Sequence, residues 1–197
     1  MKRLPLILAA LVLIAGGFTI KTYNGLQRAD ESVAAAWAEV ENQYQRRADL
    51  VPNLVETVKG YAKHEQTLLT EITAARARVS SIAPTPEMLS DAAALERYRA
   101  AQSELGNGLA RLLAVSENYP DLKASRNFEN LMTQLEGTEN RITTARNRYI
   151  EQVRDYNSRL RTFPASLIAS SIGMTAKANF QVENEAAIST PPQVSFP

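Results

Sequence analysis

The fold of this chain is decided by a stretch of fifty residues, VAAAWAEVENQYQRRADLVPNLVETVKGYAKHEQTLLTEITAARARVSSI (residues 33–82). Apolar residues recur in it at alternating steps of four and three, a spacing that places them along one side of an α-helix. Only Arg47 and Glu65 interrupt this seam. The seam consists of Val33, Trp37, Val40, Tyr44, Arg47, Val51, Leu54, Val58, Tyr61, Glu65, Leu68, Ile72, Ala75, Val79 and Ile82. The pattern predicts helices that pack side by side in a bundle or coiled coil.

The same stretch contains signals for a turn, although its regular spacing argues against one. Arg46 and Arg47 suit the last turn of a helix, where cations meet the negative end of the helix dipole. Asp49 suits the N-cap of a following helix, with Pro52 in its first turn. A second signal stands at residues 59–60, Lys-Gly. Three alternatives therefore remain open, namely a turn near Asp49, a turn near Gly60, or one continuous helix that is kinked at the proline.

Breaks further along the chain separate more helical segments. Residues 82–86 end the first stretch, and Thr85 followed by Pro86 is typical of a helix start. Residues 118–121 predict a loop, and the long segment after it ends at residues 162–164. Each segment carries one apolar stripe, so it is stable only against the others. We predict an all-α fold, in which an N-terminal transmembrane helix precedes a helical bundle at residues 23–180 and a flexible tail at residues 181–197.

Residues 1–22 have the character of a membrane anchor. Lys2 and Arg3 precede an apolar run from Leu4 to Ile20, which is at the short end of what crosses a bilayer as a helix. The same features would suit a cleaved secretory signal peptide. However, the run is longer than a typical signal core, and no A-x-A site follows it. The basic N-terminus favours an orientation with the soluble domain outside the cytoplasm.

Composition excludes several classes of protein. The 22 basic and 21 acidic side chains nearly balance, which argues against a nucleic-acid-binding protein, because such proteins carry a basic excess or stripe. The chain has no cysteine, so disulfides, thiolate metal sites and a lipid anchor on cysteine are excluded.

Several longer motifs point to one family. They are RRADLVPNLV (residues 46–55), VKGYAKHE (residues 58–65), ENYPDL (residues 117–122) and LEGTENRI (residues 135–142), together with Ala36-Trp37 and Phe163-Pro164. With these motifs the chain resembles the LemA family from the anchor to about Phe180. The resemblance implies a single-pass protein of the bacterial inner (cytoplasmic) membrane, in which the N-terminal transmembrane helix is followed by an up-and-down antiparallel four-helix bundle. It implies no established enzymatic activity. Four helices favour a real turn in the first stretch over a kinked single helix.

The sequence offers little chemistry. Its one histidine, His64, stands beside Glu65, whereas a zinc site needs three or four ligands. The glycines form no phosphate-binding loop. We therefore predict no catalytic residue, metal or cofactor, and a non-enzymatic interaction or scaffold module for another envelope protein. The alternative is an envelope enzyme or small-ligand binder with a polar pocket between helices.

Two sets of polar residues are predicted to matter. If the first stretch turns near Asp49, two loops meet at the end of the bundle farthest from the membrane. A partner-binding surface is expected there, formed by Arg46, Arg47, Asp49, Asn53, Glu117, Asn118, Tyr119 and Asp121. The structural alternative is that these residues act as helix caps and dipole partners.

The second set concerns the charged break at Glu65. Counting along the helices places Glu65 level with about Arg141, so a buried pair with Arg141 or Arg146 is expected. The alternative is a carboxylate at the edge of the core that reaches water. The opposite end of the bundle, near residues 163–172, is expected to lie near the bilayer surface.

Overall fold

The computed structural model describes residues 3–62 and 64–180, and every regular element in this part of the chain is helical. The predicted all-α class is confirmed. The tail predicted at residues 181–197 lies outside the described residues. The elements in order are α1 (Leu4–Lys59), α2 (Gln66–Ser81), the short 3-10 helix η1 (Pro86–Ser90), α3 (Ala92–Ser116), α4 (Pro120–Lys123), α5 (Arg126–Arg161) and α6 (Ala165–Ser171).

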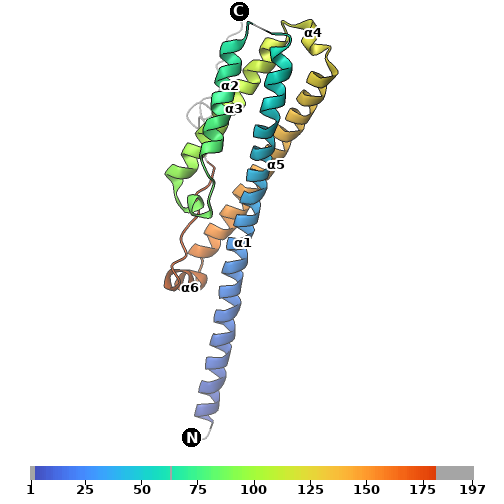
Figure 1. Cartoon of the computed structure of the whole chain (residues 1–197). Coiled ribbons are helices and arrows are strands. Elements are labelled where there is room, and N and C mark those ends of the chain that lie inside the picture. The colour runs from blue at the N-terminus through green and yellow to red at the C-terminus, as the bar shows by residue number, and fades with distance from the viewer. Residues whose placement is uncertain (1–2, 63, 181–197) are drawn as a thin grey trace, which may run out of the picture.

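Helix α1 joins the anchor to the bundle without a break. Its 56 residues correspond to a length of about 84 Å at the usual rise per residue. The large apolar side chains between Ile7 and Ile20 are exposed, whereas Leu26 and the seam beyond it are buried. Helix α1 is the one helix in the described chain that is long and apolar enough to cross a membrane. Figure 1 shows it running from the N-terminus to the far end of the bundle.

The first turn of the bundle lies at residues 60–65. Helix α1 continues through Pro52 and ends at Lys59, so the alternative turn near Asp49 is wrong and the turn near Gly60 is correct. The heptad seam explains this outcome, because Val51 and Leu54 stay buried on the same side of one helix.

A neighbouring helix compensates for the proline inside α1. Pro52 has no N–H to donate to the carbonyl of Ala48, four residues earlier. The Nε of Arg76, on α2, donates to that carbonyl oxygen at 2.9 Å. The backbone acceptor that the proline leaves open is therefore satisfied by the helix packed beside it, and the helix is maintained.

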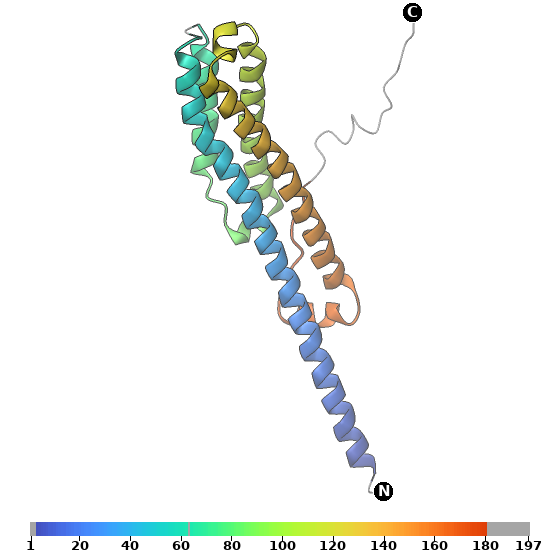
Figure 2. The same ribbon diagram turned by 90° about the vertical axis from the view of Figure 1, so that its right-hand side faces the viewer.

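The bundle has two halves with different walls. Helices α1 and α5 pack against each other along its length, and the α2–α3 hairpin covers them in the half farther from the membrane span, here called the distal half (Figures 1 and 2). The distal core is almost entirely aliphatic and comprises Val51, Leu54, Val55, Val58, Ala62, Leu68, Leu69, Ile72, Ala75, Val79, Ala101, Leu105, Leu109, Leu112, Leu122, Phe128 and Leu135.

The half nearer the membrane span, the proximal half, has an aromatic core. It contains Trp37, Tyr44, Tyr98, Tyr149, Tyr156 and Phe180, with Met88, Leu89 and smaller residues around them. The indole of Trp37 lies 5.4 Å from the ring of Tyr149 and 5.9 Å from that of Tyr98, measured between centroids. The aromatic residues of the sequence seams are therefore core residues, with the exception of Tyr61, which is 46% exposed.

An extended segment, residues 174–180, closes the proximal half and is here called the strap. It follows Gly173, whose φ of 72° ends α6 in a left-handed conformation that suits glycine. The hydroxyls of Tyr149 and Tyr156 donate to the carbonyl oxygens of Ala178 (2.8 Å) and Thr175 (3.0 Å). An extended strand outside a sheet cannot satisfy its own backbone, so side chains of α5 do so.

Candidate interaction site

Two turns meet at the distal end of the bundle. One is the reversal between α1 and α2, and the other holds α4 between α3 and α5. Ala62 and Leu122 are buried and fix one turn each to the core. The hydroxyl of Tyr119 donates to Oε1 of Glu65 at 2.9 Å, so the two turns are joined directly. This bond also raises the pKa of the Tyr119 hydroxyl, because the carboxylate accepts its proton.

The surface around this bond is polar with one exposed aromatic ring. His64, Asn118 and Asp121 are exposed, and Lys123 pairs with Glu117 at 2.5 Å. Tyr61 is 46% exposed although it continues the apolar seam. A tyrosine surrounded by polar and charged side chains is the composition found at many protein–protein contacts.

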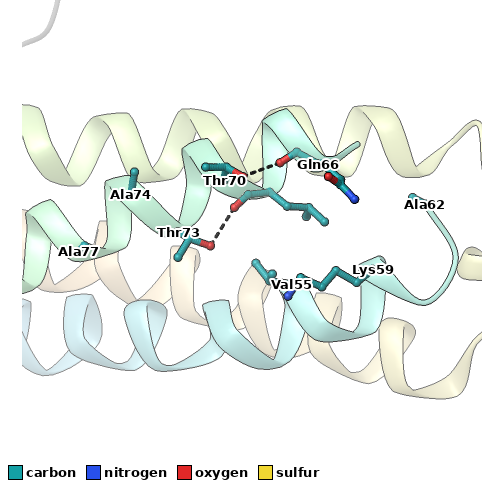
Figure 3. Close-up of a pocket in the computed structure, with 9 residues that line it drawn as sticks. Val55, Lys59, Ala62, Gln66, Thr70, Thr73, Ala74 and Ala77 are labelled. Carbon is teal, nitrogen blue, oxygen red and sulfur yellow. Dashed lines mark hydrogen bonds between the residues drawn. The ribbon is translucent and has the colours of Figure 1, made fainter. Parts of the chain in front are cut away.

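A groove between α1 and α2 opens beside these turns (Figure 3). Its volume is about 720 Å³, and its lining is mostly apolar or small: Val55, Lys59, Ala62, Gln66, Leu69, Thr70, Thr73, Ala74 and Ala77. The hydroxyls of Thr70 and Thr73 donate to carbonyls of their own helix, at Gln66 and Leu69. The groove therefore offers methyl groups and apolar carbons to a partner, with the polar Lys59 and Gln66 together at its distal end.

The structure separates the predicted site residues into three places. Glu117, Asn118, Tyr119 and Asp121 belong to the second distal turn, as expected. Because α1 does not turn at Asp49, that residue lies about 15 Å along the helix from its end. Arg46, Asp49 and Asn53 are exposed on the flank of α1. The sequence reasoning missed Tyr61, the groove and the distal position of Glu65, although residues 59–60 carried the signal for that turn.

Arg47 is buried in this structure, so its side chain is not part of a binding surface. Its side chain is only about 5% exposed. One Nη atom donates to the backbone and side-chain oxygens of Gln102, at 2.8 and 2.7 Å, and the other donates to Glu139 at 3.0 Å. Arg47 thereby joins α1, α3 and α5 between the two cores. A Cβ at Gly106 would lie 3.3 Å from its guanidinium, so this glycine allows the close approach.

The predicted partners of Glu65 lie elsewhere. Arg141 is exposed, and the guanidinium of Arg146 lies over the ring of Phe180, 4.8 Å from its centroid. Glu65 stands at the N-cap of α2 and is half-buried against Tyr119. The count from the turns failed because residues 82–91 are not one continuous helix: α2 ends at Ser81 and α3 begins only at Ala92, so Glu65 reaches the second distal turn. Of the two charged breaks in the seam, Arg47 is the one inside the bundle.

The described residues contain few groups arranged for catalysis. Among them, no cluster of three or more histidine, cysteine, aspartate or glutamate side chains has the geometry to hold a metal ion. The small polar cleft between α3 and α5, about 190 Å³, contains the Arg47–Glu139 pair and Arg99, which pairs with Glu96. Arg146, whose guanidinium lies over the ring of Phe180, also lines this cleft.

These features define a class of protein, a membrane-associated helical bundle carried on a long apolar helix. The LemA family model matches residues 36–196, and the chain belongs to the LemA family. It is 26% identical over 175 residues to magnetosome protein MamQ 2 of Paramagnetospirillum magneticum, an alignment that covers 81% of this chain and 64% of that relative.

Two further relatives support the assignment. The chain is 25% identical to magnetosome protein MamQ of Magnetospirillum gryphiswaldense, with coverage of 87% of this chain and 69% of the relative. It is 24% identical to protein LemA of Metamycoplasma hominis, with coverage of 80% and 68%. None of these three names states an enzymatic activity.

Proposed function

We propose that this protein is a non-enzymatic interaction module of the bacterial cell envelope, which holds a binding surface away from the inner membrane. The observation that carries the proposal is the position of the α1–α2 groove. It lies at the far end of a helix about 84 Å long, beside the exposed Tyr61 and the two joined turns. The expected partner is another envelope protein with an apolar segment that enters the groove.

The proposed binding surface keeps part of the residue set expected from sequence. It comprises Tyr61, Glu65, Glu117, Asn118, Tyr119 and Asp121 on the two distal turns, together with the groove beside the first of them. Arg46, Asp49 and Asn53 lie on the outward side of α1, roughly 120° to 180° around the helix from the groove residue Val55. They therefore form a separate candidate patch, whereas Arg47 is left to the core. Contacts at such surfaces are dominated by a few well-packed side chains, and Tyr61 is the exposed aromatic residue best placed for this role.

The orientation is part of the proposal. We place the bundle outside the cytoplasm, since Lys2 and Arg3 flank the other side of the apolar run. Because the chain has no native cysteine, a single cysteine at the exposed Ser80 can be labelled alone. A membrane-impermeant maleimide should label it in spheroplasts. Labelling that needs lysis would reverse the orientation.

The groove itself is tested by blocking it. Ala74→Glu places a charge on the groove lining, and Ala35→Glu makes the same change at an exposed position of α1 in the proximal half. A photo-crosslinking amino acid at residue 61 reports the contact. The yield of crosslinked adduct with a protein partner should fall at least several-fold in Ala74→Glu and stay unchanged in Ala35→Glu. Circular dichroism should show that both variants are folded. Equal adduct in both variants would exclude the groove as the binding surface.

A further inference from the structure

Exposed apolar side chains gather at the proximal end of the bundle. Phe163, at the turn between α5 and α6, is 76% exposed, and Leu167 and Ile172 in and after α6 are 63% and 42% exposed. Single exposed apolar residues are common on soluble proteins, but a cluster at one place marks a contact surface. The opposite side of α6 packs against the bundle, because its Ala169 is buried.

This element is held in a defined position on the bundle. Helix α6 packs against both α1 and α5. Its C-terminal end is fixed by the N–H of Met174, which donates to the carbonyl of Ala169 at 3.0 Å, an arrangement that Gly173 permits. The strap that follows is bonded to α5 by Tyr149 and Tyr156. The exposed apolar residues therefore sit on a fixed part of the molecule.

The element lies where the membrane span leaves the bilayer. In both overall views, α6 is at the lower end of the bundle and only α1 continues below it (Figures 1 and 2). The exposed apolar part of α1 ends at Ile20, and the helix becomes buried at Leu26. Six residues of helix separate these positions by about 9 Å.

That distance matches the thickness of the headgroup layer. The apolar run from Leu4 to Ile20 spans about 26 Å as a helix, close to the roughly 30 Å of a hydrocarbon core. A headgroup layer extends about 5 to 8 Å farther on each side. The proximal end of the bundle, with α6, therefore falls at the level of this layer.

We propose that α6 and the turn before it form a second membrane contact, in which Phe163, Leu167 and Ile172 enter the headgroup layer of the leaflet from which α1 emerges. Lipid is the expected occupant, because this apolar surface continues the lipid-facing surface of α1. The exposed Tyr23 and Phe163 suit an aromatic belt at the interface. Exposed basic residues Lys21 and Arg161 suit anionic headgroups.

The contact would fix the orientation of the bundle relative to the membrane. One spanning helix leaves a domain free to rotate and tilt about its anchor, whereas a second contact beside it restricts both motions. The inference is independent of the proposed partner at the distal end, since it concerns the opposite end of the bundle.

The test uses single-cysteine variants of the full chain in vesicles of phosphatidylethanolamine and phosphatidylglycerol. An environment-sensitive fluorophore is attached at residue 163 in one variant and at residue 113 in the other, because Leu113 is an exposed leucine on α3 in the distal half. Probe 163 should show blue-shifted emission. It should also be quenched at least twofold by lipids brominated near the glycerol end of the acyl chain, and probe 113 should not be quenched.

A second comparison separates α6 from the anchor. In a chain labelled at residue 163, Leu167→Glu with Ile172→Glu should abolish the quenching while the protein still floats with the vesicles through α1. Native-like circular dichroism confirms the fold. If probe 163 is no more quenched than probe 113, or if the double variant leaves its quenching unchanged, the second membrane contact is overturned.

Discussion

The distal and proximal halves of the bundle both bury an apolar core, but different elements enclose the two cores. Four helices enclose the distal half, and most of its backbone hydrogen bonds lie within these helices, with Arg76 supplying the donor that Pro52 lacks, so aliphatic side chains are sufficient for its core. The proximal half is enclosed by α1, α5, η1, the start of α3 and an extended strap whose carbonyls need outside donors. Its core is accordingly built from tyrosines, which fill space and also carry a hydroxyl. The comparison shows that the proximal core is kept closed by the strap, and that the strap is held by hydrogen bonds from the Tyr149 and Tyr156 hydroxyls.

The difference extends to the surfaces. The distal half presents a groove and an exposed tyrosine at its far end. The proximal half presents apolar side chains next to the span. We assign the first surface to a protein partner and the second to lipid, and the two cores hold these surfaces apart.

The largest expected effect comes from removing the centre of the aromatic core. Trp37→Ala should lower the free energy of unfolding by about 3 to 5 kcal/mol, the usual cost of deleting a buried tryptophan. Because Trp37 packs 6.2 Å from Phe180 in the strap, hydrogen exchange should accelerate more at residues 177–180 than in α2.

The matched variant in the distal half is Leu105→Ala. It should cost about 2 to 5 kcal/mol but accelerate exchange in α2 and α3 more than in the strap, because Leu105 is in the aliphatic core. Identical hydrogen-exchange patterns in the two variants would show that the two halves unfold as one unit and do not differ in local stability.

The junction between the halves should show the next largest effect. Arg47→Ala leaves Glu139 and the carbonyl of Gln102 without their donor. The free energy of unfolding should fall by about 2 to 3 kcal/mol. This is low for a broken buried ion pair, because the Glu139 side chain is 43% exposed and water can hydrate it. Glu139→Gln, which keeps an acceptor, should cost about 1 kcal/mol in the same urea titration. Equal losses would mean that charge, and not the hydrogen-bond geometry, holds the junction.

A smaller effect is expected at the proline of α1. Arg76→Met leaves the Ala48 carbonyl unsatisfied and should cost about 1 to 2 kcal/mol. In a Pro52→Ala background the alanine N–H supplies the missing donor, so Arg76→Met should then cost only a few tenths of a kcal/mol. A double-mutant cycle with no coupling between residues 52 and 76 would contradict this account of the unbroken helix.

The smallest effect under ordinary conditions is pH-dependent and should be largest in the proximal half, although the pKa of Tyr119 at the distal turns is raised as well. Burial raises the pKa of Tyr98 and of Tyr156 from 10 to about 12, and it raises that of Tyr149 as well. The folded state therefore favours the protonated hydroxyls. Stability should be constant below pH 10 and fall as the pH rises from 10 through about 12.

Exchange-based or tyrosine-absorbance measurements would follow this loss. Between pH 10 and 12 the strap should open before α2 does, and Tyr98→Phe should reduce the slope of stability against pH. A slope that is unchanged in this variant would remove Tyr98 from the explanation.

Much of the fold could be predicted from the sequence because it depends on local periodicity. The seam of residues 33–82 predicts helices, and its phase correctly carries α1 past Pro52. The end of the long segment at residues 162–164 is also predicted correctly, since α5 ends at Arg161. The strap carries no periodic pattern, and its bonds to Tyr149 and Tyr156 are 29 and 19 residues distant in sequence.

The candidate site was harder to predict because it depends on the level at which each helix ends. Arg47 and Glu65 break the seam in the same way, and nothing local distinguishes the buried residue from the one in a turn. The partners of Arg47 lie 55 and 92 residues away. The count along the helices did not allow for residues 82–91, which form a loop and η1 and not one continuous helix, and this displaced Glu65 from Arg141 toward Tyr119.

The division of the two surfaces between protein and lipid is tested most directly by photo-crosslinking in living cells. One full-length variant carries a benzophenone amino acid at residue 61 and a second carries it at residue 163, both exposed in the structure. The account predicts a discrete protein adduct from residue 61, which Ala74→Glu removes, and lipid adducts without a discrete protein adduct from residue 163. Discrete protein adducts from residue 163, with none from residue 61, would contradict it.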